Sequence, residues 1–150
     1  MKHNAVYIAS YSTPLLEKFI NYVMLDGKKS VARDITKEML ATMKEKTKQD
    51  PLKVFEQAVS NVKPAMEVRA KRIGGAVYQI PMEVKPKRQV MLAFRWIIDA
   101  ARKRKGAPMA EKLATELLQA FNNEGASMKK KEDTHRMAQA NKAFAHYARY

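Results

Sequence analysis

The stretch MEVRAKRIGGAVYQIPMEV, residues 66–84, decides the fold class because its apolar side chains alternate with polar ones, unlike those of the segments around it. Gly74 and Gly75 divide the stretch into two runs. Alternation predicts two strands, and paired glycines between strands suit a tight turn. A lone two-stranded ribbon is only marginally stable in water. We therefore expect a β-hairpin that leans on helices or on a ligand and projects at its tip.

Helical periodicity surrounds this stretch, since apolar residues recur there every three or four positions. Thr13 and Asp50 each precede a proline, a pattern typical of helix starts, and Ser30 is placed to cap the second helix. The expected helices cover residues 14–25, 31–48, 51–62, 87–104, 109–123 and 133–148, after an extended tail over 1–12. The predicted fold is mostly α, a single domain of five or six helices with one protruding two-stranded β-hairpin.

The charge of the chain is strongly positive, with 29 Lys plus Arg against 15 Asp plus Glu and a net charge of +14. Between Lys63 and Lys105, twelve basic residues stand against three acids. The run Arg102–Lys105 ends this region at the C-terminal end of a predicted helix. Ordinary solvated surfaces intersperse both signs, so this excess favours contact with the phosphates of a polyanion over a merely soluble surface.

The hairpin carries the most specific candidates for nucleic-acid binding. Arg69, Lys71 and Arg72 lie on or beside it, where arginines reach phosphates or stack on exposed bases. The glycine-rich tip lets the backbone approach a nucleic acid closely. Tyr78, the aromatic residue nearest the tip, is expected to anchor the ribbon more than to stack on a base. Because a β-ribbon also enters DNA grooves, a DNA-binding architectural protein with a basic β-arm is the alternative function.

The last predicted helix carries a polar and basic stripe at steps of three and four residues: His135, Gln139, Lys142, His146 and Arg149. This stripe suits a second nucleic-acid surface and equally an ordinary exposed helix face. Met137 and Phe144 follow the other side of the same helix, and Met137 has the spacing of a core residue.

Catalytic and metal-dependent functions find no support in the sequence. The chain has no cysteine, which excludes disulfides, zinc–thiolate sites and thiol nucleophiles, and three histidines complete no metal or catalytic set. The segment 26–29, Asp-Gly-Lys-Lys, lacks the upstream glycines of a phosphate loop, although its lysines suit an RNA backbone. No cofactor is expected. With no apolar run long enough to span a bilayer and no signal peptide, we expect a cytoplasmic protein with no membrane partner.

Four separated motifs resemble one protein family. They are LDGKKS at 25–30, KRIGGAVYQIPMEV at 71–84, RWIIDAARKRK at 95–105 and KKKEDTHRMAQANKAFAHYARY at 129–150. In this order they are similar to bacterial-type small ribosomal subunit protein seven, over most of the chain from Leu15 onward. The resemblance implies a non-catalytic protein of the small subunit, in cytoplasmic or organellar ribosomes. It implies binding to the 3′ major domain of the small-subunit rRNA and a start of head assembly.

The resemblance also implies partners and site residues. The hairpin and the C-terminal helix of such proteins face the exit-site tRNA beside the mRNA path, and their neighbours include ribosomal proteins nine and eleven of the small subunit. It makes repression of its own messenger conceivable. This chain lacks the arginine-rich start that is usual in the family. Including Arg69 from the hairpin pattern, the expected rRNA contacts are Lys28, Lys29, Arg69, Lys71, Arg72, Tyr78, Arg102, Lys103, Arg104 and Lys105. The expected tRNA-facing residues are Arg72, Gly74, Gly75, Lys142, His146 and Arg149.

Overall fold

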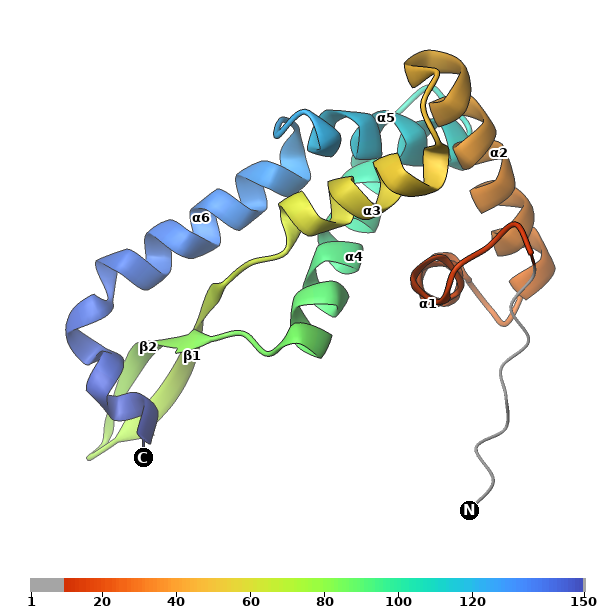
Figure 1. Cartoon of the computed structure of the whole chain (residues 1–150). Helices are drawn as coiled ribbons and strands as arrows, with labels where there is room; N and C mark the ends of the chain where they lie inside the picture. Colours follow the sequence, from red (N-terminus) through yellow and green to blue (C-terminus); the bar gives the residue numbers. More distant parts are fainter. Residues whose placement is uncertain (1–9, 150) are drawn as a thin grey trace.

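Three α-helices, a hairpin, three more α-helices and a final 3-10 helix follow one another in the computed structural model, which describes residues 10–149 (Figure 1). The elements are α1 (Pro14–Val23), α2 (Lys29–Thr47), α3 (Pro51–Val62), β1 (Met66–Ile73), β2 (Ala76–Glu83), α4 (Pro86–Lys103), α5 (Met109–Phe121), α6 (Ala126–Ala140) and a final 3-10 helix, η1 (Lys142–Arg149). The expected mostly α single domain with one hairpin is therefore confirmed. Most of the expected tail over 1–12 lies outside the described residues, and a turn occupies Ser10 and Tyr11.

The core lies where the first five helices meet, and phenylalanine rings form its centre. Phe19, Phe55 and Phe94 are fully buried, one from each of α1, α3 and α4. The ring of Phe19 meets the other two edge-on with centroids 5.1 Å away. Such aromatic pairs stabilise a core beyond the area that they bury. This packing holds α4 in place, and α4 carries the C-terminal end of the hairpin.

The helix starts follow the capping pattern at two of three predicted positions. The Thr13 hydroxyl accepts from the Leu16 N–H at 3.2 Å, and the Asp50 carboxylate accepts from the Leu52 N–H at 3.1 Å. The prediction that Ser30 caps the second helix is wrong, because α2 already begins at Lys29. Positive φ angles over residues 26–27 close a tight turn that brings the chain into the helix early.

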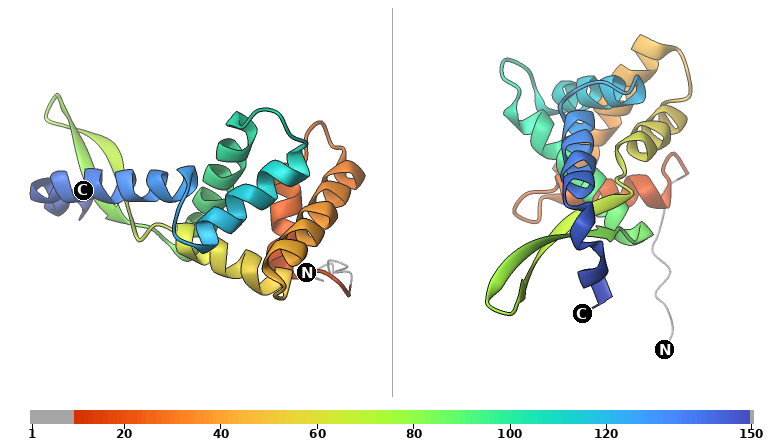
Figure 2. Two further views of the ribbon diagram at one scale, coloured as in Figure 1. Left: turned by 90° about the horizontal axis from the view of Figure 1, so that it is seen from above. Right: turned by 90° about the vertical axis from the view of Figure 1, so that its left-hand side faces the viewer.

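The predicted hairpin is confirmed, with β1 and β2 antiparallel and Ile73 paired with Ala76. Gly74 and Gly75 between them have φ of +57° and +86°, as a two-residue hairpin turn with both central residues left-handed requires. The ribbon projects from the helical body (Figure 2). Along its length it packs against α6 and η1, so it leans on helices as expected.

The C-terminal region differs from the predicted single helix over 133–148. Helix α6 begins seven residues earlier, at Ala126, because the Ser127 N–H and hydroxyl donate to the buried carboxylate of Glu116 at 3.1 and 3.0 Å. It ends at Ala140, and η1 follows. The three-residue turn of a 3-10 helix places residues three apart on one side. Phe144 and Tyr147 therefore both reach the hairpin.

Met137 is not the core residue that its spacing suggested. Its side chain is 52% exposed, whereas Ala138 beside it is buried. Helix α6 packs against β1, and the small residue Ala138 lies on its buried side. The spacing of Met137 therefore predicts the wrong buried face for this helix.

Candidate nucleic-acid interface

Three basic turns lie on the same side of the molecule (Figure 2). They are the α1–α2 connection with Lys28, the hairpin tip, and the end of α4 with its connection to α5. In the left view of Figure 2 all three point to the upper edge, and in the right view all three point to the left. The α2–α3 connection lies on the opposite side in both views. Segments far apart in the sequence thus form one face.

This face is extended because α4 separates its parts. The helix has 18 residues, so about 27 Å separate its ends. The hairpin joins its start at Pro86, and Arg102 and Lys103 stand at its end. Cations spread over such a length suit the backbone of a large polyanion better than a small ligand.

Most of the predicted rRNA contacts are solvent-exposed on this face. Six of them are exposed and form no ion pair within residues 10–149: Lys28, Lys29, Arg72, Arg102, Lys103 and Lys105. An exposed cation without a carboxylate partner is free to approach a phosphate. The glycines of the hairpin tip are exposed as well, and next to them Val77 is 66% exposed.

Arg104 differs from the rest of its basic run because it has an internal partner. Its guanidinium donates to the Glu116 carboxylate at 3.2 and 2.9 Å and to the Gln119 side-chain oxygen at 2.5 Å. Glu116 is fully buried and also accepts from Ser127. Through these bonds one carboxylate ties the end of α4 and the start of α6 to α5. Arg104 therefore shapes the connection that displays Arg102 and its neighbours.

The base of the hairpin holds an ion-paired cluster that periodicity did not indicate. The Glu67 carboxylate accepts from the Arg88 Nε at 2.7 Å and from the Arg69 Nε at 3.3 Å. Glu67 is only 8% exposed although the strand pattern placed it on the polar face. The hydrogen bond that Arg88 donates to Glu67 raises the pKa of Arg88. Arg88 was missed because nothing in the sequence indicates that it packs beside a residue 21 positions earlier.

Tyr78 is covered by the C-terminal segment and so anchors the ribbon, as its position favoured. Its ring centroid lies 5.2 Å from that of Phe144 and 5.2 Å from that of Tyr147. These contacts attach η1 to β2. Its place among the expected rRNA contacts remains a prediction. Lys71, half-buried on the neighbouring strand, completes the set of hairpin cations.

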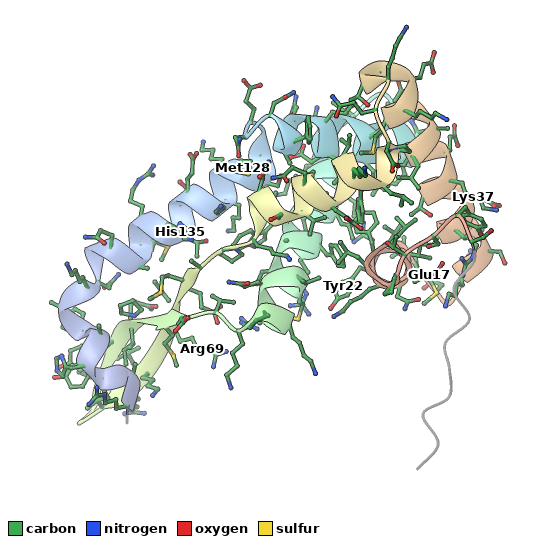
Figure 3. The ribbon with its side chains drawn as sticks, in the orientation of Figure 1. Glu17, Tyr22, Lys37, Arg69, Met128 and His135 are labelled. Carbon is green, nitrogen blue, oxygen red and sulfur yellow. The ribbon has the colours of Figure 1, made fainter. Side chains whose placement is uncertain are left out.

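The predicted C-terminal stripe is broken at its first member. His135 turns toward the hairpin base, where its Nε2 accepts from the Ala65 N–H at 3.0 Å (Figure 3). Burial lowers the pKa of His135, and the charge of Lys131 adds to this effect. Lys142, His146 and Arg149 remain exposed, but they lie on the 3-10 helix beside β2. A continuous α-helical face is therefore wrong, while a basic edge beside the ribbon persists.

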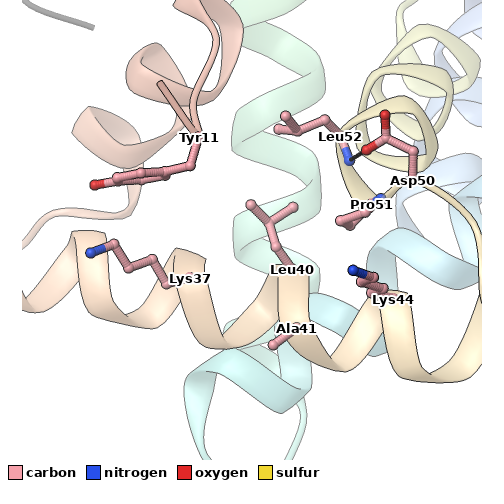
Figure 4. Close-up of a pocket in the computed structure, with 8 residues that line it drawn as sticks. All are labelled: Tyr11, Lys37, Leu40, Ala41, Lys44, Asp50, Pro51 and Leu52. Atoms are coloured by element: carbon pink, nitrogen blue, oxygen red, sulfur yellow. Dashed lines mark hydrogen bonds between the residues drawn. The ribbon is translucent and has the colours of Figure 1, made fainter. Parts of the chain in front are cut away.

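Metal binding finds no support among the described residues. Within residues 10–149 no group of three His, Cys, Asp or Glu side chains gathers as metal ligands would. A hollow of about 310 Å³ lies between α2 and the start of α3, lined by apolar groups and lysines (Figure 4). There the Lys37 ammonium stands 4.7 Å from the centre of the Tyr11 ring. No helix in the described part of the chain combines the length and apolarity needed to cross a membrane.

The chain is similar to known proteins of one family. The family model for ribosomal protein S7p/S5e matches residues 1–142. The small ribosomal subunit protein uS7 of Dictyoglomus turgidum is 59% identical over 137 residues, which is 91% of this chain and 88% of the relative. The protein of the same name from Thermotoga petrophila is also 59% identical with the same coverage, and that from Desulfatibacillum aliphaticivorans is 56% identical.

Proposed function

Since this chain belongs to the ribosomal protein S7p/S5e family, we propose that it binds the 3′ major domain of the small-subunit rRNA and begins assembly of the subunit head. The membership makes it a structural protein of the small ribosomal subunit, not an enzyme. Binding to small-subunit rRNA and to other ribosomal proteins goes with that membership. Membership in a ribosomal family argues against the alternative of a DNA-binding architectural protein with a basic β-arm.

One observation carries the proposed rRNA contact. The α1–α2 turn, the hairpin tip and the end of α4 point to the same side (Figure 2). Lys28, Arg72 and Arg102 in these segments are exposed and form no ion pair within residues 10–149. Because phosphate contacts supply most of the affinity for nucleic acid, a face built from three separate basic turns engages several RNA segments at once. Holding several segments together is what a protein that starts assembly needs to do.

The other edge of the hairpin supports a second contact, with the exit-site tRNA beside the mRNA path. There η1 lies along β2 and presents Lys142, His146 and Arg149 to solvent. Arg72, Gly74 and Gly75 belong to that tip. We place ribosomal proteins nine and eleven of the small subunit among the neighbours of this region, as the family resemblance implies.

Binding to a transcript of the 3′ major domain tests the proposal, measured beside an unrelated structured RNA of equal length over a salt series. We expect a preference for the rRNA transcript that persists as salt rises, because shape-specific contacts remain when counterion release weakens. Equal binding to both RNAs that vanishes with salt would refute the proposal.

Paired variants locate the binding face. Replacing Lys28 and Arg102 by alanine should weaken rRNA binding and flatten its salt dependence by about one phosphate contact for each cation removed. The matched control replaces Lys46 and Lys53, which are exposed near the opposite α2–α3 connection. Equal losses from both pairs would contradict the assigned face.

A further inference from the structure

We propose that Arg69 and Arg88, positioned by Glu67, form a clamp for one RNA phosphate at the base of the hairpin. The inference deepens the proposed rRNA binding and rests on it. It adds Arg88 as a ligand and Glu67 as a positioning residue, neither of which the sequence pattern or the family resemblance indicated.

The hydrogen bonding at Glu67 leaves the outer ends of both guanidiniums available. Each arginine donates to the same carboxylate oxygen through its Nε, at 2.7 Å for Arg88 and 3.3 Å for Arg69. Within residues 10–149 their terminal amino groups make no further hydrogen bond that would hold them. The side chain of Arg88 is 38% exposed and that of Arg69 is 52% exposed. Two forks of donors are therefore fixed at one end and open to solvent at the other.

A shallow cavity of about 270 Å³ lies at this point, roomy enough for a phosphate group. Three cations and two carboxylates line it together with a methionine: Arg69, Lys85, Arg88, Glu67, Glu83 and Met82. The charge of Glu67 is outweighed by the two arginines that donate to its Oε1 atom, which leaves these three side chains with a net charge of +1. Glu83 is exposed, makes no ion pair within the described part of the chain, and opposes an anion here.

The start of α4 adds a second source of attraction at the same place. Lys85 precedes the helix and provides no side-chain cap, and the first turn, which contains Arg88, has no acidic residue. The first N–H groups of a helix have no partners within it and carry a partial positive charge. An anion bound between the arginines would be attracted by the partial positive charge at this helix end.

A purely structural role explains only part of the arrangement. One arginine suffices to neutralise Glu67, and Arg88 already joins β1 to α4. The second arginine gives the cluster a net charge of +1. Half-exposed ion pairs of this kind add little to stability. Shared anchoring removes conformational freedom from both side chains before binding, which strengthens contact with a planar or tetrahedral anion.

The clamp and a simple dependence on net charge predict opposite effects of Glu67→Gln on the affinity for rRNA. Both this variant and its matched control, Glu83→Gln, remove one negative charge from the same cavity. If net charge alone set the affinity, both variants would bind rRNA more tightly than the wild type. The clamp predicts that Glu83→Gln tightens binding up to about threefold, while Glu67→Gln weakens it about tenfold, the loss expected for one hydrogen bond to a charged group. Tighter binding by both variants would overturn the clamp.

Arg88→Lys decides the question if Glu67→Gln melts at a temperature too low for the assay. Lysine keeps the charge but lacks the fork and the Nε donor, so we expect about tenfold weaker binding. The control, Arg136→Lys, changes an exposed arginine paired with Asp133 on α6 and should alter affinity less than twofold. Equal affinities for both variants would refute the clamp. If the wild-type protein did not prefer the rRNA transcript, the proposed function itself would fail.

Discussion

Truncation of Phe94 to alanine is the sharpest test of the helical core. Phe94 is fully buried, and its ring centroid lies 5.1 Å from that of Phe19, 5.6 Å from Tyr22 and 6.4 Å from Phe55. Phe→Ala changes in cores cost about 3 to 5 kcal/mol. Each lost aromatic pair is worth roughly 0.5 to 1.5 kcal/mol beyond the area buried, so three partners place the cost near the upper end, about 4 to 5 kcal/mol.

Thermal unfolding followed by far-ultraviolet circular dichroism measures this cost. A change of 1 kcal/mol shifts Tm by about 2 to 4 °C in domains of 150 to 250 residues. We therefore expect Tm to fall by about 8 to 20 °C in Phe94→Ala. The matched control is Phe144→Ala, which truncates a half-buried ring on η1 that meets only Tyr78 and Tyr147 among the rings of the described residues.

The control separates the core from the hairpin cluster. Loss of Phe144 should loosen η1 locally and lower Tm by only a few degrees, because segments with little burial open without global unfolding. The main core would not be the centre formed by Phe19, Phe55 and Phe94 if Tm fell by less than about 3 °C in Phe94→Ala. The same would follow if Tm fell further in Phe144→Ala than in Phe94→Ala.

Three further substitutions test single contacts. Glu116→Gln should lower the free energy of unfolding by about 2 to 3 kcal/mol in urea titrations, because Arg104 then loses its charged acceptor, and an unchanged midpoint would contradict this. The lowered pKa of His135 means that the unfolded chain binds the proton more tightly, so stability should fall as pH drops below about 6.5. In His135→Gln that share of the pH dependence should disappear, whereas a pH profile identical to that of the wild type would show that His135 does not contribute to it. Gly125→Ala should cost more than about 1 kcal/mol, because φ is +93° and the added Cβ would lie 2.8 Å from a glutamine oxygen; a wild-type Tm would count against this close approach.

Features that depend on neighbours in the chain were predictable. Alternation around Gly74 and Gly75 led to a hairpin with the expected turn, since strand period and turn conformation are properties of a few consecutive residues. The caps at Thr13 and Asp50 are local for the same reason. The excess of basic residues indicated a polyanion partner, because net charge needs no tertiary structure to act at a distance.

The start of α6 was not predictable, because it depends on a contact made eleven residues away in the sequence. The carboxylate that holds Ser127 belongs to α5. Segment 126–132 is rich in lysine and shows no apolar period, so the sequence pattern alone leaves it outside a helix. Packing against a buried acceptor overrides that weak local preference.

The sequence by itself determined the helical fold, the hairpin and the positive charge. Only the tertiary structure decided which cations are available to RNA. It pairs Arg104 internally, turns His135 to a backbone N–H 70 residues away and gathers Arg69 and Arg88 on one carboxylate. The physical reason is that a hydrogen bond or an ion pair acts over a few ångströms, and only the packing of distant elements sets which groups come that close.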